Sequence, residues 1–185
     1  STSRPFLTDG GLHHYADFHG AAYNQVLAHT HGMISLIDAG VGRVLEKLAE
    51  QGLRDDTIVA FTSDHGDCLG DHHFLYKAQT PCRSLLHIPL VISGPGVARG
   101  DVEEPVGNVD IMPTLLELCG IDIPESVQGE VLPAPGRKPA RPYAFESGWS
   151  KYGPQCIHFT MYRRDWRLSV FPHLGDGELY DLCLL

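Results

Sequence analysis

The chain has 185 residues, of which 43% are hydrophobic and 20% charged, and its formal net charge is −9. This composition is typical of a globular protein, and no apolar run is as long as a membrane span. The acidic charge argues against non-specific nucleic-acid binding and against binding to a membrane surface. An anionic small-molecule partner would therefore need a metal ion or a few cations to reverse the potential locally.

Cysteine usage bears on the compartment. The cysteines are odd in number and widely spaced, and no two have the spacing of a zinc-binding or redox pair; they are Cys68, Cys82, Cys119, Cys156 and Cys183. We expect free thiols and a reducing, cytoplasmic compartment, with the periplasm as the alternative. The chain begins at Ser1 without a signal-like apolar region and gives no indication of targeting.

The first predicted element is a helix over about residues 15–51. Apolar residues recur there at three- and four-residue intervals, namely Val26, Met33, Ile34, Ile37, Val41, Val44, Leu45 and Leu48. Gly52 is a natural end for this helix. Gly32 indicates either a break in the helix or close packing against a neighbour.

Two strands and a second helix are predicted next. The β-branched, apolar run at residues 57–62 predicts a buried strand, and residues 88–93 predict another, with Pro89 tolerated at its start. The following Gly94-Pro95-Gly96 predicts a turn, because it lacks the lysine and spacing of a phosphate-binding loop. Residues 108–120 predict a short helix ending at Gly120.

The last third of the chain predicts a separate small sheet. Residues 121–142 are rich in Pro, Gly and charge, which favours a surface connection. Four short extended runs follow at residues 143–146, 156–162, 166–171 and 178–182, separated by polar turns. We therefore predict an α/β fold with a boundary near residue 135, followed by an antiparallel sheet subdomain at residues 136–185.

The chemistry is concentrated just after the first predicted strand, in Ser63-Asp64-His65-Gly66. In open α/β sheets, ligands bind at the carboxyl ends of the strands. A carboxylate and an imidazole in one turn suit a divalent cation, and Gly66 would supply the tight bend. The alternative is a simple strand-ending turn with His65 exposed. A site is favoured by the polar residues that follow, which are Asp67, Asp71, His72, His73 and Lys77.

Several segments, taken together and in chain order, resemble the C-terminal half of a sulfatase. The branch is that of the alkaline phosphatase superfamily which contains arylsulfatases, choline sulfatases and phosphonate monoester hydrolases. The segments are residues 32–38, 41–45 and 57–72, Lys77, and residues 88–96, 110–116 and 178–182. The resemblance implies an alkaline-phosphatase-like sandwich, with a partial central sheet flanked by helices. It makes residues 1–135 the C-terminal part of the catalytic α/β domain.

The resemblance also implies an activity, which is hydrolysis of sulfate esters at one divalent metal, with calcium or manganese favoured over magnesium or zinc. Asp64 and His65 would be metal ligands, and Lys77 would contact the oxygens of the anion. The family's nucleophile is a formylglycine made from a Cys/Ser-x-Pro-x-Arg motif, and no cysteine of this chain begins one. We therefore expect no hydrolysis by this chain alone, and association with the missing N-terminal half or with further copies.

Several points stay open at this stage. His72 is a candidate proton donor to the leaving group, as is His73, and His13, His14 and His19 are weaker candidates. Arg83 and His87 stand where the family often has Glu and Arg, which leaves the substrate undecided between sulfate and phosphate or phosphonate. The alternatives are a two-metal phosphodiesterase, with His158 or His173 on the second metal, and a non-catalytic fragment.

Overall fold

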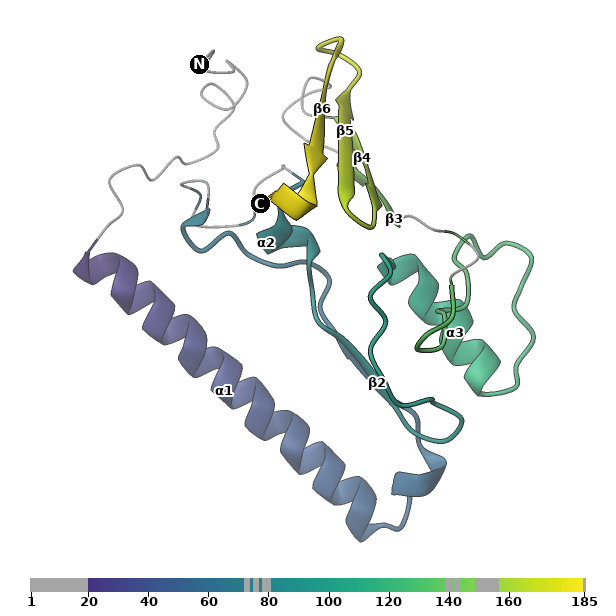
Figure 1. The fold of residues 1–185 in the computed structure, drawn as a ribbon. Coiled ribbons are helices and arrows are strands. Elements are labelled where there is room, and N and C mark those ends of the chain that lie inside the picture. The colour runs from purple at the N-terminus through teal and green to yellow at the C-terminus, as the bar shows by residue number, and fades with distance from the viewer. Residues whose placement is uncertain are drawn as a thin grey trace. The chain divides into compact units, whose positions relative to one another are not determined.

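The structure is a computed structural model (Figure 1) that describes residues 20–71, 74, 77, 81–138, 141, 144–148 and 157–184. The chain divides into two contact units. The first comprises residues 1–78 and 83–95, and the second comprises residues 79–82 and 96–185. Each unit is described by itself below. The boundary expected near residue 135 stays a prediction.

The first unit begins with the long helix α1, Ala21–Glu50 (Figure 1). Gly52 ends it as predicted, because its φ of +69° lets Gly52 N donate to Ala49 O (3.0 Å) and Leu53 N donate to Leu48 O (2.9 Å). The break predicted at Gly32 is wrong. A Cβ added at Gly32 would meet nothing within 4 Å, so close packing is not the reason for this glycine either.

The apolar stripe of α1 is exposed. No residue of α1 is buried. The exposed apolar side chains include Met33, Ile34, Leu36, Ile37 and Val44, with exposed fractions of 55% or more. The stripe therefore has the pattern of a core-facing helix without a core against it among the described residues.

Two strands follow α1 and the short 3-10 helix η2 (Arg54–Asp56). β1 (Val59–Thr62) pairs antiparallel with β2 (Leu90–Ser93), with Val59 opposite Ser93 and Thr62 opposite Leu90. Both strands were predicted, but the predicted burial of β1 is wrong, because Ala60, Phe61 and Thr62 are exposed. A sheet of two described strands covers too little surface to bury its own side chains.

The helix predicted in the second unit is present. It begins as the 3-10 turn η4 (Asn108–Asp110), continues as α3 (Ile111–Leu118), and is followed by Gly120 at a φ of +67°. The described part of the connection that follows, residues 121–138, contains no helix or strand, as expected. None of the described helices is long and apolar enough to cross a membrane.

The C-terminal sheet is a four-stranded antiparallel meander, as predicted (Figure 1). Its strands, in spatial order, are β3 (Ala144–Gly148), β4 (His158–Arg163), β5 (Trp166–Phe171) and β6 (Asp176–Asp181), and η6 (Leu182–Leu184) follows. The described residues thus mix helices with antiparallel sheets, which confirms the fold class in its coarse form.

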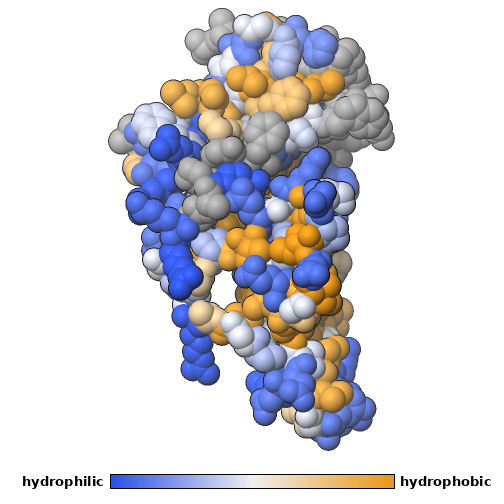
Figure 2. Space-filling view, turned by 90° about the vertical axis from the view of Figure 1, so that its right-hand side faces the viewer, coloured by the Kyte–Doolittle hydropathy of each residue, from blue (hydrophilic) through white to orange (hydrophobic). Residues whose placement is uncertain are grey.

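The two faces of this sheet are unusual. The buried face carries polar side chains, with Thr160 and Ser169 fully buried and joined through their hydroxyls at 3.0 Å. The apolar side chains on the other face are exposed: Phe159, Trp166, Leu168, Val170 and Leu179. Figure 2 shows hydrophobic surface at several places on one face of the molecule.

The described cysteines are free, as expected. Cys68 and Cys82 are buried, and Cys119 and Cys183 are exposed. Cys156 lies outside the described residues.

Candidate functional site

The loop that follows β1 carries the predicted cluster. The chain leaves β1 at Thr62 and turns at once, with Ser63 Oγ donating to His65 O (2.8 Å). His65 N donates to Asp64 Oδ1 (2.9 Å). These local bonds fix the backbone, so that the carboxylate and the imidazole leave the same turn.

Three polar side chains meet in this loop. His65 Nε2 lies 3.7 Å from Asp64 Oδ2 and 3.3 Å from Lys77 Nζ. The side chain of Asp64 is 86% exposed and that of His65 is 42% exposed, so both can be reached from solvent. The structure therefore brings together the carboxylate, imidazole and ammonium that the sequence singled out.

The hydrogen bonds of His65 decide which ring nitrogen carries the proton. His65 Nδ1 lies 2.7 Å from Gly66 O, which can only accept a hydrogen bond. Lys77 Nζ can only donate, and it lies against Nε2. A neutral imidazole satisfies both neighbours with its proton on Nδ1 and a lone pair on Nε2, which is the form that binds a metal through Nε2.

Gly66 is needed for a reason other than the one expected. Its φ is not in the left-handed region, so the tight bend does not require glycine. Instead, the short helix α2 (Arg83–Leu86) lies directly against it. A Cβ at Gly66 would collide with the carbonyl oxygen of Ser84, and Gly66 N donates to Leu85 O (2.8 Å). Glycine is therefore required by the close approach of α2.

The rest of the loop is anchored by buried side chains and by α1. Cys68 and Phe74 are buried, and Gly70 N donates to Phe74 O (2.7 Å). Tyr23 in α1 donates its hydroxyl to Leu69 O (2.9 Å), and its ring lies where a Cβ on Gly70 would be. The loop is therefore held by the burial of Cys68 and Phe74 and by the hydrogen bond from Tyr23 of α1.

The electrostatics of Asp64 favour the carboxylate form. The hydrogen bond from His65 N, followed by the charge of a protonated His65 ring, holds the pKa of Asp64 below its ordinary value of 3.8. Asp64 is therefore charged at neutral pH, and its oxygens are available as hard ligands for a divalent cation.

The donor set is compatible with part of a metal site. One carboxylate oxygen and one imidazole nitrogen converge, and both types of donor suit Ca, Mn, Mg or Zn to different degrees. Within the part of the chain that the structure describes, no group of three or more His, Cys, Asp or Glu side chains is placed to hold a metal ion. Asp64 and His65 would thus need further ligands from elsewhere in the protein.

The remaining candidates are five histidines and the pair Arg83 and His87. His72 and His73 lie outside the described residues, as do His13, His14 and His19. Arg83 and His87 lie one helical turn apart on α2 and its end. Arg83 Nε donates to His87 Nδ1 (3.2 Å), so the two departures from the family pattern form one polar pair.

His158 and His173, the candidates for a second metal, differ in setting. The side chain of His158 is 3% exposed, and its Nε2 lies 3.0 Å from Glu146 Oε2. Gly148 lies directly against its ring, because any Cβ there would collide with Cε1 of His158. This packing favours a structural role for His158. His173 is exposed in the turn between β5 and β6.

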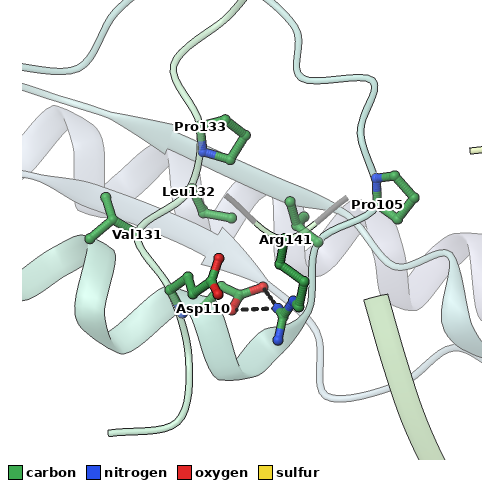
Figure 3. Close-up of a pocket in the computed structure, with 8 residues that line it drawn as sticks. Pro105, Asp110, Val131, Leu132, Pro133 and Arg141 are labelled. Carbon is green, nitrogen blue, oxygen red and sulfur yellow. Dashed lines mark hydrogen bonds and ion pairs between the residues drawn. The ribbon is translucent and has the colours of Figure 1, made fainter. Parts of the chain in front are cut away.

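A buried polar network at the start of α3 was not anticipated. Asp110 accepts hydrogen bonds from Gly107 N (2.9 Å), Glu130 N (3.0 Å) and Arg141 Nη2 (2.7 and 2.8 Å). Thr114 extends it, accepting from Leu132 N (2.9 Å). Figure 3 shows Asp110 and Arg141 facing each other. Glu130 and Arg141 are 20 and 31 residues away from Asp110 in the sequence, so no local pattern could have indicated these two hydrogen bonds.

The pocket at this network is a weak candidate for a ligand site. It encloses about 210 Å³ including space open to solvent, and its walls are Pro105, Val106, Asp110, Glu130, Val131, Leu132, Pro133 and Arg141. Because Arg141 and two backbone N–H groups already bond the carboxylate of Asp110, the network is better explained as a structural clamp on the connection after α3.

Comparison with known proteins places these features in context. Residues 7–121 match the Sulfatase family, more than half of the chain. The chain is 41% identical over 131 residues to the multifunctional alkaline phosphatase superfamily protein PehA of Trinickia caryophylli, covering 66% of this chain and 25% of that protein. It is 33% identical over 169 residues to an arylsulfatase of Clostridium perfringens, covering 87% and 34%.

Solved structures give a similar result. The phosphonate monoester hydrolase of Agrobacterium radiobacter matches with a TM-score of 0.76 and 28% identity, covering 88% of this chain and 36% of that one. A protein solved in complex with its substrate D-glucosamine-2-N,6-O-disulfate matches with a TM-score of 0.75 and 26% identity, covering 91% and 37%. The chain thus spans about a quarter to a third of the two curated relatives.

Proposed function

Because the chain belongs to the sulfatase family of the alkaline phosphatase superfamily, we propose that it forms part of a metal-dependent sulfate ester hydrolase, in which it supplies two metal ligands and an anion-binding lysine. The observation that carries the proposal is the meeting of Asp64 Oδ2 and Lys77 Nζ at His65 Nε2, at 3.7 and 3.3 Å. Outside such a family, an exposed cluster of this kind could be a solvated turn.

Each of the three side chains has a distinct task. Asp64 and His65 would hold a divalent cation, Ca or Mn by preference, and the bound cation would polarise the ester and offset the charge that builds up on its oxygens. Lys77, a donor-only point charge, would bind a non-bridging oxygen of the sulfuryl group. None of these residues is a nucleophile, and the chain contains no Cys-x-Pro-x-Arg sequence from which formylglycine could form.

The proposal includes an arrangement for the rest of the protein. We propose that this chain forms the C-terminal part of an alkaline-phosphatase-like sandwich and contributes part of its central sheet, whose other strands and remaining metal ligands lie in the part of the relatives beyond the matched region. The exposed stripe of α1, with Met33, Ile34 and Ile37 each more than half exposed, supports this. The 185-residue chain alone should therefore be inactive and self-associate. A stable, clean monomer in size-exclusion chromatography would contradict that expectation.

The test is turnover by the full-length protein. We expect hydrolysis of an aryl sulfate that is abolished by EDTA and restored by Ca²⁺ or Mn²⁺. Asp64→Ala and His65→Gln should each weaken metal binding and turnover together. Metal analysis that finds one ion per active protein supports the proposal, and full activity of both variants would refute it.

A second candidate is hydrolysis of phosphonate or phosphate esters. The match to the phosphonate monoester hydrolase of Agrobacterium radiobacter favours it, because its TM-score of 0.76 and identity of 28% are similar to the 0.75 and 26% for the protein solved with a disulfated glucosamine. The two candidates differ in substrate and not in the cluster, so the same protein should be offered an aryl sulfate and an aryl phosphonate monoester. Two bound metal ions would instead favour the two-metal phosphodiesterase.

A further inference from the structure

The inference concerns how His65 is held, and it rests on the proposed role of His65 as a metal ligand. A histidine ligand must present a lone pair, and its tautomer is set by the hydrogen bond that its other ring nitrogen makes. In this chain, that bond runs from His65 Nδ1 to the carbonyl of the next residue, Gly66, at 2.7 Å.

Gly66 is itself held from the other side. Its N–H donates to Leu85 O (2.8 Å) in α2, and Leu85 is buried with 5% of its surface exposed. The contact is too close for any side chain, because a Cβ at Gly66 would collide with Ser84 O and lie 3.3 Å from Leu85 Cα. The N–H and the Cα of Gly66 are therefore held against α2, and the carbonyl that accepts from His65 is attached directly to this Cα.

We infer that Gly66 and α2 together form a positioning clamp that keeps His65 in the Nδ1–H tautomer and aims Nε2 at the metal. In this clamp, α2 with its buried Leu85 holds the N–H and the Cα of Gly66, and the Gly66 carbonyl accepts the hydrogen bond from the ring. Gly66 and Leu85 are positioning residues, since neither would touch the metal or the substrate. The clamp explains why glycine is needed at a position whose backbone angles any residue could adopt.

The first test reads the tautomer directly. The metal-free full-length protein is labelled with ¹⁵N-histidine, and a long-range ¹H–¹⁵N spectrum is recorded above the titration range of histidine. The His65 ring is identified by the loss of its signals in His65→Gln. The clamp requires a protonated Nδ1 and an unprotonated Nε2. A protonated Nε2, or an even mixture of the two tautomers, would overturn it.

The second test loosens the clamp. Gly66→Ala should weaken binding of Mn²⁺, measured by calorimetry, by about 10- to 100-fold, which is the usual effect of losing an outer partner of a ligand. It should also turn the His65 signals into a mixture of tautomers. The matched control is Gly42→Ala in α1, where a Cβ would meet nothing within 4 Å and binding should stay within about twofold of the wild type.

The outcomes separate the clamp from the proposed function. If Gly66→Ala binds Mn²⁺ like the wild type while His65→Gln does not, the clamp is wrong and the ligand assignment stands. If His65→Gln also binds like the wild type, the ligand assignment itself is wrong. If Gly66→Ala does not fold, the wild-type spectrum still decides on the tautomer.

Discussion

Asp64 and Asp110 are both aspartates beside a nitrogen-bearing side chain, but their settings are opposite. The side chain of Asp110 is 4% exposed and is saturated by Arg141 and two backbone N–H groups. The side chain of Asp64 is 86% exposed, and it shares its turn with an imidazole and an ammonium. A buried, fully bonded carboxylate holds a fold together, whereas an exposed one in a convergent cluster can exchange its partners for a ligand.

The different settings of Asp110 and Asp64 predict different effects of substitution at the two sites. Loss of the buried carboxylate should reduce stability, and loss of the exposed cluster should reduce binding and turnover. Loss of Asp64 should leave the free energy of unfolding almost unchanged, because its side chain is exposed.

The largest effect is expected for Asp110→Ala. It leaves Arg141, whose side chain is 19% exposed, without its partner and two backbone N–H groups unbonded, which should lower the free energy of unfolding by about 3–5 kcal/mol. Urea unfolding followed by circular dichroism measures this. Asp122→Ala, an exposed aspartate in the connection after α3, is the control. Equal effects of the two variants would remove the distinction between the buried and exposed carboxylates.

Lys77→Ala should give the next largest effect, but on turnover. Removing a group that stabilises charge in the transition state usually lowers kcat by roughly 10²- to 10³-fold. The exposed Lys47 of α1, which pairs with Glu50 at 3.0 Å, provides the control variant Lys47→Ala. Steady-state kinetics of the full-length protein with an aryl sulfate would measure both. If Lys77→Ala destabilised the fold and left kcat intact, Lys77 would have a structural role like that of Asp110 and no role in turnover.

The sequence was sufficient for the elements whose cause is local. The periodicity of α1, the glycine at its end and the alternation of β3 to β6 are all short-range signals, and the structure confirms these elements. The adjacency of Asp64 and His65 is equally local, and Lys77 follows within the same loop. This is why the cluster could be predicted and the structure could bring it together.

What the sequence missed depends on long-range contacts. The contact of α2 with Gly66 joins residues about 20 positions apart, and that of Asp110 with Arg141 joins residues 31 apart. The burial of β1 was overestimated because apolar, β-branched residues indicate a strand whether or not a neighbour covers it. The same limit applies to the C-terminal sheet, where Thr160 and Ser169 are buried beside Phe171 while Leu168 and Leu179 are exposed.

Thr160 and Ser169 in the C-terminal sheet extend the comparison of buried and exposed polar groups to uncharged side chains, because they form a buried hydroxyl pair. Thr160→Val leaves the Ser169 hydroxyl buried and unbonded, which should cost about 1–3 kcal/mol of unfolding free energy. The double variant Thr160→Val/Ser169→Ala removes both partners and should recover part of that loss. Urea unfolding of the single and double variants tests this, and strictly additive effects would contradict the pairing.

The smallest effect concerns the charge of Asp64. Its pKa should be below the ordinary 3.8, chiefly because His65 N donates to Oδ1 and secondarily because of the charged His65 ring. In His65→Gln the backbone donor persists, so the pKa should rise only part of the way towards 3.8. A ¹³C-detected titration of the aspartate carboxyls in both proteins would measure this, and a wild-type pKa at or above 3.8 would contradict it.

The sign of this shift also fixes how pH acts at the site. A lowered pKa stabilises the folded state above the unfolded value, and this contribution is lost only as the pH falls through the lower folded value. Because Asp64 is exposed, the contribution to stability is small. Its consequence is for binding, since the carboxylate is charged at every pH at which an ordinary aspartate is already ionised. Protonation of Asp64 should therefore not compete with a metal ion between pH 5 and pH 8, in contrast to a carboxyl that burial had made harder to ionise.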